Sequence, residues 1–386
     1  MKDNAPRFGM VAGEASGDLL AGLLLAGLRA RWPDLTAQGI GGPRMAAQGF
    51  ESWWPLDKLS VFGYVDALWN LRELLSIRKQ LGDRLLALPS NERPAAFIGI
   101  DAPDFNFGLE QRVREGGIKT VHFVCPSIWA WRAERVEKIK RSADHVLCLF
   151  PFEPELLNRH GIAASYVGHP LADAIPLTPP KAEARAVLAL GEQAVVVALL
   201  PGSRRSEIAY IAEPLLKAAV LMQQARPELR FVMPLAPGLR ELITPLVAAH
   251  APALDLTLLD GRSHEALAAC DTCLVASGTA TLEAALFKRP MVIAYRMHAL
   301  NWWRMKGRNY QPWIGLPNVL AREFLVPELI QDACTPQALA REGLAWLDDP
   351  ARYARVQACF EEQHRTLRCN TALKASDAIA KVIDGV

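Results

Sequence analysis

The sequence predicts an α/β protein of two domains, each built on a parallel sheet. Two segments, 8–28 and 194–222, share the order buried strand, short glycine-containing loop and helix. The free N–H groups at the start of such a helix attract an anion, and glycine lets a ligand approach the backbone. A chain of 386 residues suits two domains of about 100–200 residues each. We therefore expect two α/β units, each opening with a ligand-facing loop.

The first unit is expected to place four polar side chains at one edge of its sheet. In a parallel sheet, ligands bind beyond the carboxyl ends of the strands. Because Glu14, Asp101, Ser127 and His169 each follow an expected strand, we expect all four to line one crevice. The strands are expected at residues 8–12, 95–100, 120–125, 145–150 and 165–167.

The second unit follows a proline-rich linker at 176–180 and carries two candidate phosphate loops. In the first loop, Gly202 precedes Arg204 and Arg205, whose guanidinium groups suit phosphate oxygens; an ordinary turn with solvated arginines is the alternative. In the second loop, small residues at 277–279 precede Glu283. Its carboxylate is placed to accept hydrogen bonds from sugar hydroxyls; the alternative is a solvated acid that stabilises the helix through the helix dipole. Strands are expected at 194–200, 230–234, 254–259, 272–276 and 291–295, and helices from 336 onward.

Composition excludes several classes of protein. A formal net charge of +2 with no basic half does not suit bulk nucleic-acid binding. The seven cysteines are scattered and odd in number, which is typical of a reducing cytoplasm, and Cys270-x-x-Cys273 lacks the second pair of a zinc site. The apolar run 19–28 is shorter than the ~20 residues of a membrane span, and the acids before it do not suit a signal peptide. We expect a cytoplasmic protein.

Two segments are more apolar than a water-exposed helix requires. Residues 61–77 are apolar over most of a helical circumference, and residues 300–313 mix tryptophan and tyrosine with arginine and lysine. Aromatic residues among cations suit a lipid headgroup region. Core packing and an interdomain cleft are the alternatives for both.

Nine short motifs occur in one order along nearly the whole chain. Together they resemble the lipid-A-disaccharide synthase family, the glycosyltransferases of bacterial lipid A synthesis. Cys125 departs from the pattern, in which a serine is expected before Pro126-Ser127. The motifs are GEASGD from Gly13, GPRM from Gly42, GIDAPDF from Gly99, PSIWAWR from Pro126, GHP from Gly168, LPGSR from Leu200, ASGTATLE from Ala276, YRM from Tyr295 and LPN from Leu316.

The resemblance implies a GT-B fold, with two Rossmann-like domains facing across a cleft and C-terminal helices crossing back to the first. An acceptor-binding domain would span 1–177, completed by about 350–386, and a UDP-sugar domain 178–349. The implied reaction moves 2,3-diacylglucosamine from UDP-2,3-diacylglucosamine to the 6-hydroxyl of 2,3-diacylglucosamine 1-phosphate with inversion. GT-B enzymes usually need no metal, and the sequence has no Asp-x-Asp motif, so neither metal nor cofactor is expected.

The acceptor hydroxyl needs a general base, and the resemblance assigns this role to Asp101. Asp104 is the main competitor, with Glu14 and His169 behind it, and a helix N-cap is the structural alternative for Asp101. Arg204 is expected on the diphosphate, Glu283 on the ribose and Asn318 in the nucleotide-sugar site. The residues expected to contact substrate or UDP are Glu14, Ser16, Gly17, Asp18, Ser127, His169, Gly202, Ser203, Arg204, Ser277, Gly278, Thr279, Glu283, Arg296 and Asn318.

Both implied substrates carry acyl chains, which favours a lipid-facing role for the two apolar segments. Basic residues near Arg304 and Arg308 would attract anionic lipid and the acceptor phosphate. We expect peripheral association with the inner face of the cytoplasmic membrane; the oligomeric state stays open, with a homodimer as one option. The residues expected to face lipid are Val61, Phe62, Val65, Leu68, Trp69, Trp302 and Trp303.

Two other interpretations remain at this stage. One keeps the fold and changes the chemistry, to a UDP-N-acetylglucosamine 2-epimerase or the murein-precursor transferase. The apolar segment 61–77 disfavours the epimerase, and the motifs from Gly13 and Pro126 disfavour the murein enzyme. The other is a lipid-binding or scaffold protein on a degenerate GT-B fold, which would be expected to lack Asp101, Arg204 and Glu283.

Overall fold

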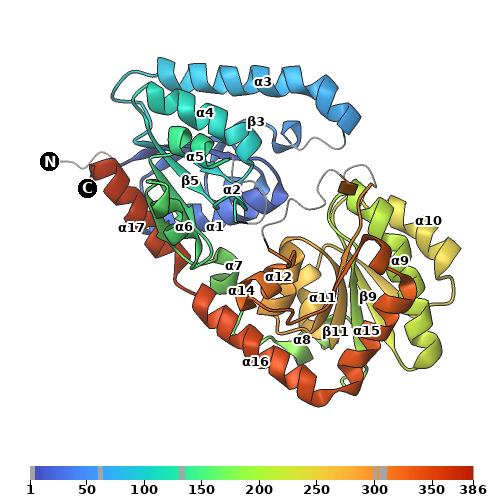
Figure 1. Ribbon diagram of the computed structural model, residues 1–386. Coiled ribbons are helices and arrows are strands. Elements are labelled where there is room, and N and C mark those ends of the chain that lie inside the picture. The colour runs from blue at the N-terminus through green and yellow to red at the C-terminus, as the bar shows by residue number, and fades with distance from the viewer. Residues whose placement is uncertain (1–4, 60–63, 130–134, 299–301, 304–310, 386) are drawn as a thin grey trace. The chain divides into compact units, whose positions relative to one another are not determined.

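The computed structural model describes residues 5–59, 64–129, 135–298, 302–303 and 311–385, without the side chains of 64–71 (Figure 1). The chain divides into two compact units. Unit 1 comprises Met1–Asp173 and Leu367–Val386, and unit 2 comprises Ala174–Thr366.

Unit 1 is built on a parallel sheet with the strand order β3-β2-β1-β4-β5-β6-β7. This is the Rossmann order with one added strand, and its connections reverse direction between β1 and β4. The strands are β1 (Arg7–Ala12), β2 (Thr36–Ile40), β3 (Glu51–Trp54), β4 (Ala96–Ile100), β5 (Lys119–Phe123), β6 (His145–Cys148) and β7 (Ala164–Tyr166). The helices are α1 (Ala15–Arg31), α2 (Pro43–Ala46), α3 (Tyr64–Ala87), α4 (Pro103–Glu115), α5 (Val136–Ser142), α6 (Glu153–Arg159), α7 (Pro170–Ala174) and α17 (Thr371–Asp384), with a 3-10 turn η1 (Leu56–Lys58).

Unit 2 repeats the same plan with the strand order β10-β9-β8-β11-β12-β13, and its reversal falls between β8 and β11. The strands are β8 (Val196–Leu200), β9 (Arg230–Leu235), β10 (Leu256–Asp260), β11 (Thr272–Ala276), β12 (Met291–Tyr295) and β13 (Glu328–Ile330). The helices are α8 (Lys181–Val187), α9 (Arg205–Ala225), α10 (Arg240–His250), α11 (Ser263–Ala269), α12 (Thr279–Leu286), α14 (Leu316–Ala321), α15 (Pro336–Asp348) and α16 (Pro350–Leu367), with η3 (Gln331–Ala333).

The central strands were the easiest to predict because helices cover both faces of each sheet. Every residue of β4, β8 and β11 is buried, so each reads as an uninterrupted apolar run. The expected strands agree with the structure to within about two residues, the usual boundary error. Strands β2, β3 and β13 were not expected from the sequence. They lie toward the sheet edges and are short and partly polar, so they lack the apolar run.

The C-terminal helices expected from residue 336 are present, but they divide between the two units. Helix α17 packs on α1 and against β5 and β6, within unit 1 (Figure 1). Helix α16 was expected to complete the first domain, yet residues 350–366 belong to unit 2. Hydrogen bonds hold α16 there, from Tyr353 Oη to the Asp271 carbonyl at 2.9 Å and from Gln363 Nε2 to the Pro317 carbonyl at 2.8 Å.

Asp271 anchors the start of unit 2, and its loss is expected to destabilise the protein. Its carboxylate accepts from Lys181 Nζ at 2.5 Å, Arg185 Nη2 at 2.9 Å and the Val196 N–H at 2.8 Å. Arg185 is buried. Asp271→Ala therefore leaves the buried Arg185 cation without its carboxylate, bonded only to the Ala269 and Glu192 carbonyls. We expect the free energy of unfolding in urea to fall by about 3–5 kcal/mol.

Asp255→Ala is the matched control, because Asp255 pairs with Arg230 on the surface at 3.6 Å. An exposed ion pair of this kind contributes about 0–1 kcal/mol. Equal losses in the two variants would contradict the anchoring role of Asp271.

Candidate functional site

Four of the loops singled out in the sequence lie at the reversal points, two in each sheet. In unit 1 the loop after β1 carries Gly13, and the loop after the adjacent β4 carries Asp101. These two loops touch: a Cβ added to Gly13 would lie only 2.4 Å from Cβ of Ala102, so only glycine fits. In unit 2 the corresponding loops follow β8 and β11. In open α/β sheets, ligands bind in the crevice at this reversal point.

Asp101 is held in a strained backbone conformation at the end of β4. Its φ is 48° and that of Ala102 is 42°, in the left-handed region that residues other than glycine seldom adopt. The buried Asn106 donates from Nδ2 to the Asp101 carbonyl at 2.8 Å, and the Asp101 N–H donates to the Phe123 carbonyl at 2.9 Å. The N-cap of α4 is Ala102, so Asp101 does not have the capping role that was its structural alternative.

Another strained residue directly follows the neighbouring strand β5. Val124 has φ of 83°, which is unfavourable for a β-branched side chain, and Ser127 lies exposed just beyond it. Strain of this kind persists where the surrounding structure fixes it, and it clusters at functional sites. Here Trp129 Nε1 donates to Oε1 of the buried Glu153 at 3.1 Å, which ties the Ser127 loop to α6.

The buried Glu153 predicts a pH dependence of stability. Burial raises the pKa of its carboxyl from the ordinary 4.5 to about 8. Between these values the folded chain holds a proton that the unfolded chain has lost, so the free energy of unfolding falls as pH rises. The slope of this fall is proportional to the number of protons lost on unfolding, and we expect Glu153→Gln to reduce that number by about one. Urea unfolding at several pH values between 5 and 8 measures the slope. Identical slopes in wild type and variant would contradict a neutral Glu153.

The other site residues expected in unit 1 divide into accessible and internal groups. Glu14 is the N-cap of α1 and accepts from Ser16 Oγ at 3.1 Å; both are partly exposed, whereas Gly17 is buried. Asp18 was expected to contact substrate, but its carboxylate is buried. It accepts from three N–H groups of residues 42–45 at 2.8 Å, 2.9 Å and 3.1 Å. Asp18 therefore fixes the β2–α2 loop.

His169 and Asp104, the competing bases, are both placed differently from Asp101. His169 was expected in the crevice, but it is 3% exposed. Its Nδ1 accepts from the Leu171 N–H at 3.2 Å, and burial lowers its pKa to about 4. The Asp104 side chain is 82% exposed, and its two oxygens accept from Arg135 Nη2 at 2.8 Å and 2.9 Å. The sequence had not singled out Arg135.

In unit 2 the predicted phosphate loop already holds a carboxylate. Gly202 has φ of 113°, and the Ser203 and Arg204 N–H groups donate to Glu207 Oε2 at 2.8 Å and 3.2 Å. Arg204 Nη1 donates to Glu207 Oε1 at 3.2 Å, and the Arg204 side chain is about half exposed. The Ser203 N–H group, which was expected to donate to a phosphate, therefore donates to Glu207 in this structure. The sequence signal for Glu207 was its position as the third residue of the helix, where an acid can cap the N-terminus.

The loop between β11 and α12 leaves a helix N-terminus open. Gly278 is the N-cap of α12, and apart from its chain neighbours no heavy atom of the described residues lies within 4 Å of where its Cβ would be. Ser277 is fixed by its N–H, which donates to the Ala294 carbonyl at 3.0 Å, while Thr279 is exposed. Glu283, one turn into α12, lies 3.5 Å from His264 Nε2 on α11. Sequence reasoning missed His264, which no motif marks.

Arg296 and Asn318 have different surroundings. Arg296 is exposed directly after β12, and Gln331 fixes the next residue by accepting from the Met297 N–H at 2.7 Å. Asn318 is buried, with Nδ2 donating to Glu328 Oε1 at 2.8 Å and Oδ1 accepting from the Val326 N–H at 2.9 Å. Its amide is hydrogen-bonded within the α14–β13 connection. The expected contact between Asn318 and the nucleotide sugar stays a prediction.

The structure does not describe the side chains of most residues expected to face lipid. Val61 and Phe62 lie outside the described residues, as do Arg304 and Arg308; Val65, Leu68 and Trp69 lie on α3 without described side chains. Trp302 is partly exposed, and Trp303 is 73% exposed. Within the described ranges, no helix combines the length and apolar character needed to cross a membrane.

One cluster of metal-binding side-chain types occurs in the described part of the chain. Cys125, Cys148 and Glu153 are all buried, with their ligand atoms within 4.8 Å of one another. A hydrogen bond with Cys148, together with burial, raises the pKa of the Cys125 thiol, and burial raises that of Cys148. Both Glu153 oxygens accept backbone or indole N–H groups. The cluster is therefore a neutral part of the core. Burial likewise raises the pKa of Cys270 and Cys273.

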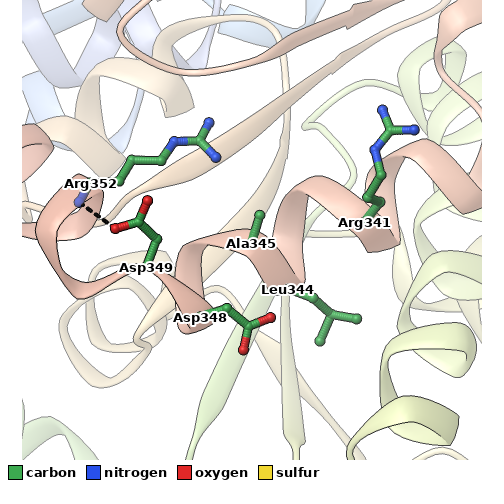
Figure 2. Close-up of a pocket in the computed structure, with 6 residues that line it drawn as sticks. All are labelled: Arg341, Leu344, Ala345, Asp348, Asp349 and Arg352. Carbon is green, nitrogen blue, oxygen red and sulfur yellow. Dashed lines mark hydrogen bonds between the residues drawn. The ribbon is translucent and has the colours of Figure 1, made fainter.

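A surface depression of about 460 Å³ lies on α15 and α16 (Figure 2). The helices bond there to the amino-end side of β11 and β12, through Trp346 to the Met291 carbonyl and Tyr353 to the Asp271 carbonyl. The charges of the depression serve the local fold. Asp349 accepts from the Arg352 N–H at 2.9 Å, Arg352 lies over the Trp346 ring at 3.8 Å, and Asp348 pairs with Arg226. We assign no ligand to this depression.

Comparison with known proteins identifies the family. The lipid-A-disaccharide synthetase family model matches residues 9–382. The lipid-A-disaccharide synthase of Verminephrobacter eiseniae is 57% identical over 98% of this chain and 97% of its own. That of Burkholderia vietnamiensis is 55% identical over 99% and 97%.

Solved structures agree in fold at low sequence identity. A putative UDP-N-acetylglucosamine 2-epimerase from Listeria monocytogenes has a TM-score of 0.67 at 12% identity, covering 98% of this chain and 97% of its own. Arabidopsis thaliana UGT89C1 complexed with UDP has a TM-score of 0.65 at 15% identity, covering 98% and 100%. With its two Rossmann-like domains of the GT-B type, the chain belongs to the lipid-A-disaccharide synthase family of glycosyltransferases.

Proposed function

We propose that the protein transfers 2,3-diacylglucosamine from UDP-2,3-diacylglucosamine to the 6-hydroxyl of 2,3-diacylglucosamine 1-phosphate, in lipid A synthesis. The products are the β-1′,6-linked disaccharide 1-phosphate and UDP. One observation carries this proposal beyond family membership: the candidate base and the candidate phosphate loops fall at the reversal points of two Rossmann sheets.

Unit 2 binds the UDP part of the donor in this proposal. The open N-terminus of α12 and the half-exposed Arg204 stabilise the negative charge that grows on the leaving diphosphate. Because Arg204 rests on Glu207 in the structure, its guanidinium turns from that carboxylate toward the diphosphate when donor binds. Glu283 accepts from the ribose hydroxyls, and His264 orients its carboxylate.

Unit 1 binds the acceptor and supplies the base. Inversion at the anomeric carbon needs a single displacement, so no covalent intermediate with the protein forms. Asp101 takes the proton from the 6-hydroxyl as the oxygen attacks. Asn106 and the contact between Gly13 and Ala102 hold the Asp101 loop in place, so the carboxylate is positioned before the substrate arrives.

Lipid substrates imply contact with a membrane surface. We propose that residues 61–69 and the exposed Trp303 attach the protein reversibly to the inner face of the cytoplasmic membrane. Replacing Val65 and Leu68 together by Glu should release the protein from vesicles of anionic lipid. If the double variant stayed on the vesicles with full activity, residues 61–69 would not be the membrane-binding segment.

The function is tested with purified protein and the two defined lipid substrates. We expect UDP release that requires the acceptor, and a β-linked tetraacyl disaccharide 1-phosphate identified by mass spectrometry and NMR. An epimerase would instead convert UDP-N-acetylglucosamine with no lipid present. That conversion, without any disaccharide, would contradict the proposal.

A further inference from the structure

Unit 1 contains a hollow that the proposed reaction has not yet used. It has a volume of about 500 Å³, within the range of small-molecule sites. It is lined from the end of β2 through α2 and from β3 through η1, so it lies at the carboxyl edge of the sheet. That edge also carries the Glu14 and Asp101 loops.

Part of the lining of the hollow, at Gly41, Gly42 and Pro43, belongs to a loop that α1 holds through Asp18. Asp18 fixes the Gly42 N–H at 2.8 Å and the Arg44 N–H at 2.9 Å. A Cβ on Gly42 would lie 2.6 Å from Asp18 Oδ2 and 2.8 Å from Leu56 Cδ2, so glycine is required there. Asp18 lies in the first turn of α1, whose N-cap is Glu14. The hollow and the reversal-point loop therefore share the start of one helix.

The walls are largely apolar and contain two fixed indole rings. Trp53 and Trp54 lie edge to face with ring centroids 6.4 Å apart, and both pack partly against the unit 1 core. The Arg84 guanidinium lies 3.7 Å over the Trp53 ring and holds it in place. Prolines 43 and 55 and Leu56 complete the apolar lining.

Polar groups in the hollow offer little to a sugar ring. The Ser52 hydroxyl is engaged with backbone, at 2.8 Å from the Trp54 carbonyl and 3.0 Å from the Gly41 carbonyl. Asp57 is exposed, and an acid repels a phosphate. Rigid indole, proline and leucine walls instead suit a hydrocarbon chain, for which each buried methylene raises affinity about fourfold.

We infer that this hollow binds one acyl chain of the lipid acceptor, an inference that rests on the proposed function. The acceptor is favoured over the donor because the hollow belongs to unit 1, which supplies the base to the acceptor. The chain continues from η1 to Leu59 and then into the apolar sequence 61–69. In the sequence, the lining of the hollow therefore comes shortly before the segment proposed to contact lipid.

Two neighbouring alanines provide a matched test. Ala46 and Ala47 are both exposed, at the last residue and the C-cap of α2, but only Ala46 lines the hollow. We expect Ala46→Phe to fill the hollow and to raise KM for a long-chain acceptor by about tenfold or more, while KM for a short-chain analogue is unchanged. Ala47→Phe should match wild type with both acceptors, and KM for the donor should not change in either variant.

A direct binding measurement separates this inference from the proposed function. Acceptors of increasing chain length are titrated into the full-length protein without donor, with wild type and both variants side by side. Chain-length dependence that disappears only in Ala46→Phe supports the hollow, even if wild type performs no transfer; that lack of transfer would overturn the function alone. Two results would contradict acyl-chain binding in the hollow. One is an active wild type with equal effects of the two variants, and the other is a raised KM for the donor in Ala46→Phe.

Discussion

We expect Asp101→Asn to lower kcat for transfer by about 10²–10⁴-fold, the usual contribution of a general base, and to leave UDP affinity unchanged. Asparagine cannot take the proton from the 6-hydroxyl at neutral pH. It does tolerate the left-handed backbone that Asp101 adopts at φ of 48°, so the loop should keep its shape. The loss should therefore appear in kcat, measured at saturating donor and acceptor, and not in the thermal stability of the variant.

Asp104→Asn is the control for this first prediction. Asp104 lies on the adjoining first turn of α4, but its exposed carboxylate is paired with Arg135. We expect its kcat to stay close to wild type. A fully active Asp101→Asn combined with an inactive Asp104→Asn would transfer the base assignment to Asp104.

Arg204→Ala should lower kcat/KM by about 10²–10³-fold, as expected when a group that stabilises leaving-group charge is removed. In the variant the Glu207 carboxylate keeps its backbone donors but loses the guanidinium, so negative charge remains unopposed in the phosphate loop. Both UDP binding and the chemical step should weaken. Competition by UDP and steady-state kinetics measure the two effects separately.

Arg205→Ala is the matched control, since Arg205 is the exposed neighbouring residue that begins α9. We expect only a small change in kcat/KM. Equal losses in the two variants would indicate a general effect of positive charge rather than a specific contact from Arg204.

The sequence predicted the fold well where the chain carries a local physical signal. The strands next to each reversal point are buried on both faces, so β1, β4, β8 and β11 were visible as apolar runs. The partly exposed β3 and β13 gave no such signal. Helix α16 was assigned to the wrong unit because its attachment depends on contacts with Asp271 and Pro317, which are distant in sequence.

For the site, motif order identified the loops but not the direction of each side chain. Asp18, His169 and Asn318 stand in motifs as plainly as Asp101 does, yet all three are buried and hydrogen-bonded within their own units. A motif marks residues that shape a loop as well as residues that touch a ligand. Arg135 was missed for a related reason, because ion pairing in the folded chain leaves no periodic trace in the sequence. Glu207 did have a local signal, its position as the third residue of α9, which was not used.

The most direct test of the whole account is a UDP titration of Asp101→Asn and Arg204→Ala by calorimetry, beside their transfer rates. We assign UDP binding to unit 2 and proton removal to unit 1. We therefore expect wild-type UDP affinity in an inactive Asp101→Asn, and weakened UDP binding in Arg204→Ala. Loss of UDP binding in Asp101→Asn, with full binding in Arg204→Ala, would contradict that division of work.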